Sequence, residues 1–175
     1  FVVIRSGFRP RCALETDDGA TNRFALIADI IEECRFGIHD ISRTDSDGIP
    51  PLPRFNMPLE LGLFLGARRY GEKPQKEKRC IILDSERYRF QRFISDIAGQ
   101  DIHSHDNTPS TCIEEVATWL RTQSRSKTVP GGRAIALEFV AFQAVLPTIC
   151  KAQGLEPDEL TFGDFATLVA EYLTV

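Results

Sequence analysis

The stretch RFNMPLELGLFLGARRYG (Arg54–Gly71) contains the clearest structural signal in this chain. Asn56 is a good helix cap and Pro58 suits a first helical turn, so we expect a helix over about Pro58–Tyr70. Apolar side chains cover nearly every side of this helix, which predicts that it is buried. A single acid, Glu60, lies inside the apolar run and needs an explanation.

The segments around this helix alternate between runs of β-forming residues and stretches with helical spacing. The run RCIILD is continuously apolar, as is typical of a parallel strand covered on both sides. The first predicted strand ends near residue 14, and three more lie within 34–42, 79–84 and 99–105. The predicted helices lie at 24–34, 58–70 and 90–97, and a fourth begins near residue 110. This order predicts an α/β fold, a parallel sheet wrapped by helices with ligands at the carboxyl ends of its strands.

The pattern changes after about residue 125, where two helical stretches follow with no strand between them. We expect Pro147 to kink or end the first helix and Thr161 to cap the second. The sequence thus predicts an α/β domain at 1–125 and a C-terminal helical appendage at 126–175, packed on the same domain.

Composition narrows the possible partners. The chain has 175 residues, 42% of them hydrophobic, and a formal net charge of -4 with 26% charged residues of both signs. No large basic face points to nucleic acid, so a small molecule or a protein fits better. The five cysteines are widely spaced, which fits neither a disulfide framework nor a CxxC metal motif. We expect a reducing, cytoplasmic setting, with no signal peptide or membrane span in the first residues.

Glu60 is the strongest candidate for a reactive group. We expect it two to three residues into its helix, where free amides and the positive dipole end hold it ionised, facing the crevice at the sheet edge. Gly62 and Gly66 would leave room for a ligand or a backbone to approach. The alternative is that Glu60 caps the helix or pairs with Arg54 or Arg68.

Further candidate binding residues lie near the predicted strand ends. The segment HDIS ends a strand with Asp40 and Ser42, followed by Arg43, and Asn56 lies one helical turn before the acid. Asp101 could line the same crevice, although it could equally belong to a turn. We predict that these five residues bind the substrate.

The three histidines are weaker candidates. His39, in the middle of a strand, is typical of a core histidine. His103 and His105 alternate on one side of an extended segment with Asp106 close by, but no third ligand is spaced to complete a metal site. We therefore predict a surface loop there and no metal. The basic and aromatic run RYRFQRF could stack on bases, but core packing is favoured.

The motifs GIHDIS, FNMPLELGLFLGA and RCIILD, in this order, resemble the TIR-like and nucleoside 2-deoxyribosyltransferase-like superfamily of flavodoxin-like proteins. The chain looks most like bacterial predicted nucleotide-binding proteins with a TIR-like domain. The resemblance covers about Cys12–His105 and implies a flavodoxin-like sheet. Folds of this superfamily begin with a strand and a loop that bind the nucleotide. The first residues of this chain resemble instead the helix that follows that strand. Either residues precede Phe1 or the site is incomplete.

The resemblance implies chemistry at the N-glycosidic bond of NAD or a nucleoside, without a separate cofactor. The superfamily's glutamate at this helix start maps to Glu60, and its strand-end residue maps to Asp40. A carboxylate can stabilise or attack the positively charged sugar that forms when the base leaves. A deoxyribosyltransferase is the second enzyme hypothesis. The third hypothesis is a non-catalytic module that senses a nucleotide or self-associates into a homo-oligomer.

Overall fold

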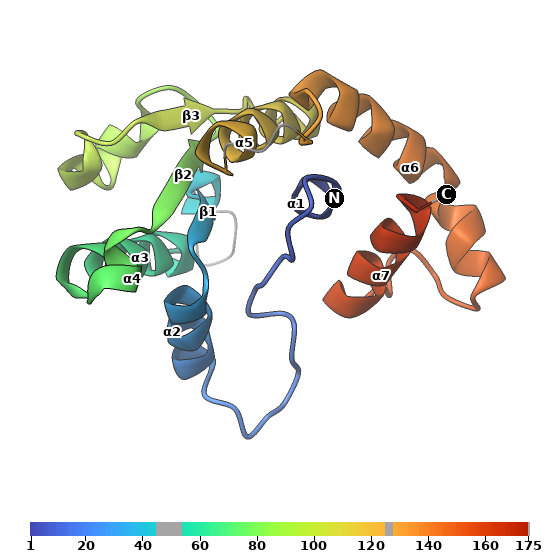
Figure 1. Ribbon diagram of the computed structural model, residues 1–175, viewed down its shortest axis with the longest axis horizontal. Coiled ribbons are helices and arrows are strands. Elements are labelled where there is room, and N and C mark those ends of the chain that lie inside the picture. Colours follow the sequence, from blue (N-terminus) through green and yellow to red (C-terminus); the bar gives the residue numbers. More distant parts are fainter. Residues whose placement is uncertain (45–53, 125–127, 175) are drawn as a thin grey trace. The chain divides into compact units, whose positions relative to one another are not determined.

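The computed structural model is a mixed α/β protein, drawn in Figure 1, and it describes residues 1–44, 54–124 and 128–174. Three parallel strands form one sheet in the order β1-β2-β3, flanked by helices. This arrangement confirms the predicted α/β class and is compatible with a flavodoxin-like layout, whereas the specific fold stays a prediction.

Contacts divide the chain into two compact units. Unit 2 spans Ala20–Thr108 and contains the sheet, and unit 1 comprises Phe1–Gly19 with Pro109–Val175 and is helical. This division differs from the predicted one at residue 125, because the helix α5 (Pro109–Ser124) packs against the helix α6 (Gly132–Ala152) of unit 1.

Unit 2 places its helices between successive strands. Its elements in chain order are α2 (Arg23–Glu33), β1 (Phe36–Asp40), η1 (Ser42–Thr44), α3 (Asn56–Tyr70), α4 (Lys73–Lys76), β2 (Arg79–Asp84), η2 (Arg89–Arg92), η3 (Ser95–Ile97) and β3 (Ile102–Ser104). The predicted helix over residues 58–70 therefore exists and begins two residues earlier. Its cap position is Phe55, with no side-chain cap bond, rather than Asn56.

One side of α3 packs onto the sheet. Leu61 joins Ile41, Ile82 and Phe90 in a buried cluster, with other apolar residues of α3 packed around it. The prediction that α3 is buried on nearly every side is wrong, since Leu59 is 55% exposed. A helix that covers one face of a sheet leaves its far side to solvent.

His39 and Phe64 join β1 to α3. Their rings meet edge to face with centroids 5.1 Å apart, and both side chains are buried. A Cβ at Gly37 would come within 2.7 Å of His39 Nε2 and 2.8 Å of Phe64, so only glycine leaves room for this packing. Because side chains alternate along a strand, Asp40 faces the opposite side of the sheet from His39.

Lys78, directly before β2, caps the C-terminal end of α2. Its Nζ, buried in unit 2, donates to the carbonyl oxygens of Ile31 and of Cys34, the latter at 2.5 Å. The same ammonium lies 5.3 Å from the ring centroid of Phe64. A cation at this position satisfies free carbonyls and complements the negative helix end, while burial lowers the pKa of Lys78.

The predicted strand ending near Leu14 does not form. Residues 7–22, all within the described part of the chain, contain neither helix nor strand. Pro10 offers no backbone donor, and Arg11 instead binds Glu15 at 2.7 Å while the Glu15 amide donates to the Cys12 carbonyl. Local turn contacts thus replace the expected ladder.

The predicted helix over residues 90–97 is also wrong, because two short 3-10 turns occupy this segment. Tyr88 precedes them in the left-handed region at φ 62, and Ile94 between them is not helical. The apolar residues that suggested a helix still reach the core of unit 2, with Phe90 only 4% exposed.

Among the remaining predictions for unit 2, the helix α2 and the short strand β3 are confirmed. The buried face of α2 differs from the prediction, since Phe24 is 54% exposed and Ile30 is buried instead. A Cβ at Gly62 or Gly66 would meet nothing within 4 Å, so neither glycine serves a close backbone approach within the described structure.

The described residues of unit 1 form the helices α1 (Val2–Arg5), α5 (Pro109–Ser124), α6 (Gly132–Ala152) and α7 (Phe162–Tyr172). Thr161 and Asp164 form a reciprocal capping box at the start of α7, as the predicted cap requires. Pro147 does not end α6, which continues to Ala152. The bond that proline loses lies on an exposed stretch, where water can satisfy the freed carbonyl.

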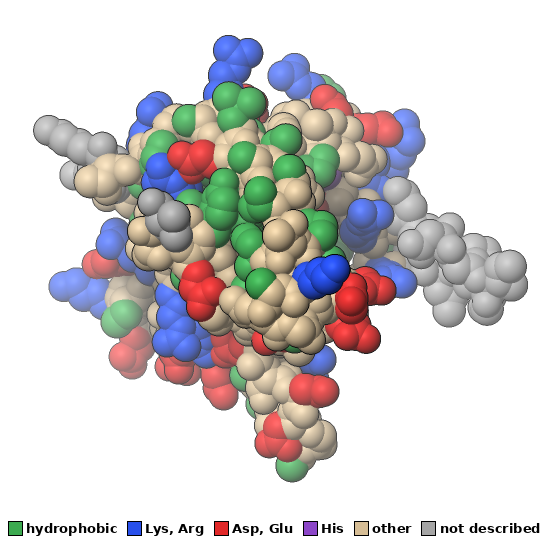
Figure 2. Space-filling view, turned by 90° about the vertical axis from the view of Figure 1, so that its right-hand side faces the viewer, with side chains coloured by type: hydrophobic (Ala, Val, Ile, Leu, Met, Phe, Trp, Pro, Cys, Tyr) green, Lys and Arg blue, Asp and Glu red, His purple; other side chains and the backbone are tan. Residues whose placement is uncertain are grey.

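One helix of the described residues, α6, is long and apolar enough to cross a membrane by length and composition. Mostly buried core helices of soluble proteins pass the same test, whereas 22% of the apolar window of α6 is buried, and the helix contributes Ile135, Phe142 and Cys150 to the cores of unit 1. Figure 2 looks onto the side on which α6 and α7 lie, where hydrophobic side chains gather in the middle and charged ones surround them. The arrangement is compatible with a soluble protein.

Burial of His39 predicts a specific acid sensitivity. Desolvation lowers the pKa of His39 from 6.5 to about 4. Between these two pH values the histidine is therefore protonated in the unfolded chain and neutral in the folded protein. The free energy of unfolding should therefore fall by about 3 kcal/mol between pH 7 and pH 4, at about 1.4 kcal/mol per unit. Urea unfolding at both pH values should show that His39→Leu loses this component. His103→Gln, at a half-buried histidine, is the control, and equal acid losses in wild type and His39→Leu would contradict the prediction.

Candidate functional site

Polar side chains stand at the carboxyl ends of all three strands in unit 2. β1 ends at Asp40, β2 ends at Asp84, and His105 follows β3. The register pairs Asp40 with Leu83 and Asp84 with Ser104, so these ends lie at one edge of the parallel sheet. This edge is where open α/β folds bind their ligands.

Asp84 and Arg89 form a buried ion pair at this edge. Arg89 Nε donates to Asp84 Oδ1 at 2.7 Å, and the Ser85 amide donates to the same oxygen at 2.7 Å. Arg89 Nη2 also donates to the Ile41 carbonyl at 2.8 Å and to Thr44 Oγ1 at 3.0 Å. The guanidinium thus ties the end of β2 to the segment after β1.

Sequence reasoning missed this pair. Asp84 is 0% exposed, and its second oxygen, Oδ2, has no hydrogen-bond partner among the described residues. The available signal was the position of an acid directly after the apolar run RCIIL, because a buried carboxylate needs a cation or donors close by. Arg89, five residues later, lies in the run RYRFQRF, whose alternation of basic and aromatic residues suggested base stacking or core packing rather than an ion pair.

Asp40 and His105 meet on the sheet face opposite α3. Asp40 Oδ1 accepts a hydrogen bond from the Ser42 amide at 2.9 Å and lies 3.4 Å from His105 Nε2. The His105 side chain is 7% exposed and that of Asp40 is 41% exposed. The prediction of a surface loop at His105 is therefore wrong, because its amide donates to the Asp84 carbonyl and holds the residue beside β2.

Glu60 is the fifth residue of α3 and is half-buried. Burial raises the pKa of Glu60, and the positive charge of Arg23, at the start of α2, offsets part of that rise. The direction of this shift is opposite to the lowering that a helix amino end would cause. The dipole field fades beyond the first turn, where α3 carries no acid. The cation that acts on Glu60 is Arg23 rather than the expected Arg54 or Arg68.

The other predicted substrate-binding residues are distributed around this edge. Ser42 is buried in η1, Arg43 is exposed in the same turn, and Asn56 is the exposed first residue of α3. Asp101 precedes β3 and so lies at the amino end of this strand, whereas Asp40 lies at the carboxyl end of β1. The structure therefore brings Asp40 and Ser42 together, whereas Asp101 lies at the opposite edge of the parallel sheet.

Asp101 instead lines a polar hollow of about 310 Å³ with Arg87, Tyr88 and Gln91. Tyr88 is 68% exposed, and its backbone adopts φ 62, a conformation that residues other than glycine rarely take. An exposed aromatic ring can stack on a base, and an arginine beside it can bind a phosphate. In the run RYRFQRF, therefore, Phe90 belongs to the core and Tyr88 to the surface.

The described residues contain no group of three or more His, Cys, Asp or Glu side chains placed to hold a metal ion. Within them, His103 and His105 gain no third ligand. Comparison of the chain with protein-family models, with curated proteins and with solved structures gives no significant match.

Loss of the Arg89 guanidinium should destabilise the protein strongly. Arg89→Met leaves the fully buried Asp84 without its cation, which we expect to lower the free energy of unfolding by about 3–5 kcal/mol. Arg87→Met, at the neighbouring exposed arginine, should change it by no more than about 0.5 kcal/mol. Urea unfolding measures both values, and adding Asp84→Asn to Arg89→Met should restore part of the loss. Similar small effects of both arginine variants would contradict the assigned ion pair.

Proposed function

We propose that the protein binds a nucleotide at the carboxyl edge of the sheet in unit 2 and cleaves its N-glycosidic bond, as the resemblance to the TIR-like superfamily implies. The observation that carries this proposal is the half-buried carboxyl of Glu60 on α3, whose pKa is raised by burial. A partly desolvated acid near a ligand-binding edge is a common property of reactive groups.

The proposed reaction uses this carboxyl in its ionised form. The bond between C1′ of the ribose and the base breaks, its electron pair leaves with the base, and positive charge develops on the sugar. Ionised Glu60 stabilises that charge, more strongly in a half-buried site than in water. Water then adds at C1′ and loses its proton to solvent, or to the departed base where that base leaves as an anion, so the products are the free base and the sugar hydroxyl.

Groups on both sides of β1 suit a ligand that crosses the sheet edge. Glu60 belongs to the helix that covers the His39 face, whereas Asp40 and His105 lie on the other face. Asp40, half-exposed and already held by the Ser42 amide, is positioned to accept from a ribose hydroxyl. This division supports a substrate with separate base and sugar parts rather than a compact one.

Binding without turnover is the second candidate function, and one observation favours it. The side chains of Asp84 and Arg89 at this edge bind each other and neighbouring backbone groups, which is a structural role. A module that senses a nucleotide needs only the binding groups. The deoxyribosyltransferase hypothesis needs the same Glu60 as a nucleophile that passes the sugar to another base.

Replacement of Glu60 tests the proposed chemistry. Purified protein incubated with NAD and with a panel of nucleosides should release free base, scored by chromatography, and Glu60→Gln should reduce the rate at least about 100-fold. Glu72→Gln, at an exposed acid beyond the end of α3, is the matched control and should keep full activity.

Each outcome of this assay separates the hypotheses. Exchange of one base for another without net hydrolysis would support the transferase. Equal base release by wild type and Glu60→Gln would overturn the role of Glu60. Nucleotide binding with no product from either protein would support the sensing module.

The raised pKa of Glu60 predicts the acid limb of the pH profile. Because the ionised carboxylate acts, kcat/KM for base release should fall as the pH drops through the pKa of Glu60 in the free protein. Burial raises that pKa, so the limb should lie above the ordinary glutamate value of about 4.3. Initial rates at subsaturating NAD, measured across the acid range, locate the limb. A limb at or below the ordinary value would be inconsistent with Glu60 as the titrating group.

A further inference from the structure

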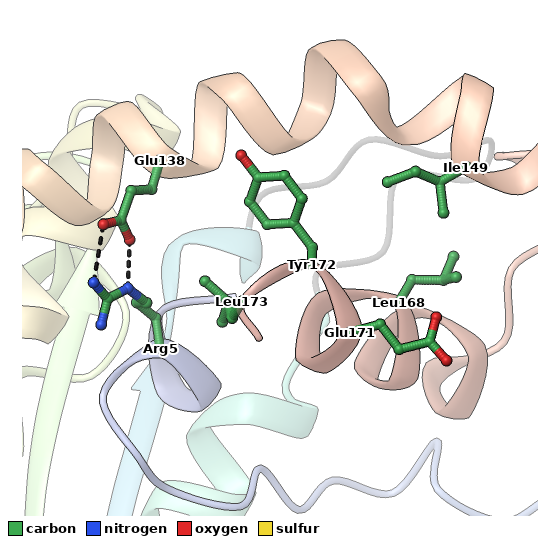
Figure 3. Close-up of a pocket in the computed structure, with 7 residues that line it drawn as sticks. All are labelled: Arg5, Glu138, Ile149, Leu168, Glu171, Tyr172 and Leu173. Atoms are coloured by element: carbon green, nitrogen blue, oxygen red, sulfur yellow. Dashed lines mark hydrogen bonds and ion pairs between the residues drawn. The ribbon is translucent and has the colours of Figure 1, made fainter. Parts of the chain in front are cut away.

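We infer that unit 1 contains a second binding site, a cavity of about 630 Å³ beside α6 and α7 that takes an uncharged amphipathic small molecule with a hydrogen-bond acceptor (Figure 3). Its volume lies within the range of known small-molecule pockets, roughly 300–1,000 Å³. This inference does not depend on the nucleotide chemistry proposed for unit 2.

One end of the cavity is apolar. Ile149 of α6 and Leu168 of α7 lie close together there, and the ring of Tyr172 stands between them and the polar end, as Figure 3 shows. Leu173 adds a further apolar side chain near the polar end. These side chains offer an apolar molecule contact in place of water.

The wall behind Tyr172 is firmly packed. Its ring centroid lies 5.1 Å from that of Phe142, which is 0% exposed and also meets Phe165 edge to face at 5.8 Å. Aromatic contacts of this kind stabilise the pair beyond the area they bury. The cavity therefore has a preformed wall and binding need not order it.

The other end of the cavity carries two free donors. Arg5 Nε and Nη2 donate to the two carboxylate oxygens of Glu138, at 2.5 and 3.0 Å, which fixes the guanidinium in a two-point pair. Among the described residues this pairing leaves Arg5 Nη1 without a partner, and the Tyr172 hydroxyl has none either. Two unpartnered donors call for an acceptor on the ligand.

The charges around the cavity disfavour an anionic head group. Arg5 and Glu138 neutralise each other, and Glu171 adds a further negative charge to the lining. A carboxylate or phosphate head would meet repulsion from Glu171 with no surplus cation to offset it. A carbonyl or ether oxygen can accept from the Tyr172 hydroxyl without that cost.

A pair of neutral fluorescent probes tests this site in the full-length chain. Prodan carries a naphthalene body and a ketone acceptor, whereas N-phenyl-1-naphthylamine has a similar body without a carbonyl. We expect saturable, blue-shifted prodan emission at one site. Tyr172→Phe should weaken prodan binding about five-fold, as loss of one hydrogen bond predicts, and leave N-phenyl-1-naphthylamine unchanged.

A blocking variant completes the design. Ile149→Trp should abolish binding of both probes by filling the cavity, and Val140→Trp, at a 53% exposed position of the same helix, should not. Equal losses in the two tryptophan variants, or prodan binding that does not saturate, would overturn the site. Unchanged prodan affinity in Tyr172→Phe, which removes a single oxygen and preserves the ring packing, would overturn the acceptor chemistry even if Ile149→Trp does not fold.

Discussion

The buried ion pair of Asp84 and Arg89 holds the sheet edge on which the candidate site of unit 2 depends. Removing two charges from water is costly, and their attraction offsets that cost only with good geometry and further hydrogen bonds. Arg89 supplies them, because it also donates to the carbonyl of Ile41 and to Thr44. The carboxyl ends of β1 and β2 are therefore joined by one side chain.

The packing between β1 and α3 decides which groups can act together. Gly37 leaves room for His39 and Phe64 to meet, and this contact places α3 on one face of the sheet. Glu60 therefore belongs to that side, while Asp40 and its histidine neighbour belong to the other. A nucleotide lying across the edge could reach both sides through its separate base and sugar parts. Partial burial is also why Glu60 holds its proton more tightly than an exposed glutamate.

The two units offer different binding chemistry. The sheet edge of unit 2 presents carboxylates, hydroxyls and a histidine, which can hydrogen-bond to ligand hydroxyls. The cavity of unit 1 presents leucine, isoleucine and a tyrosine ring, with one neutralised ion pair at its end. Such a lining discriminates by shape and by one or two hydrogen bonds, so the ligands expected at the two places belong to different chemical classes.

Local sequence patterns were enough to predict the main helices from their spacing, the central strand from the apolar run RCIILD, and the helix cap at Thr161. Local pattern failed where tertiary contacts compete, as at residues 90–97, which kept their apolar packing without forming a helix. Only the tertiary structure brought His105 beside Asp40 and Arg5 beside Glu138. These partners lie far apart in the chain, and spacing along one element carries no information about which distant side chain will lie beside it.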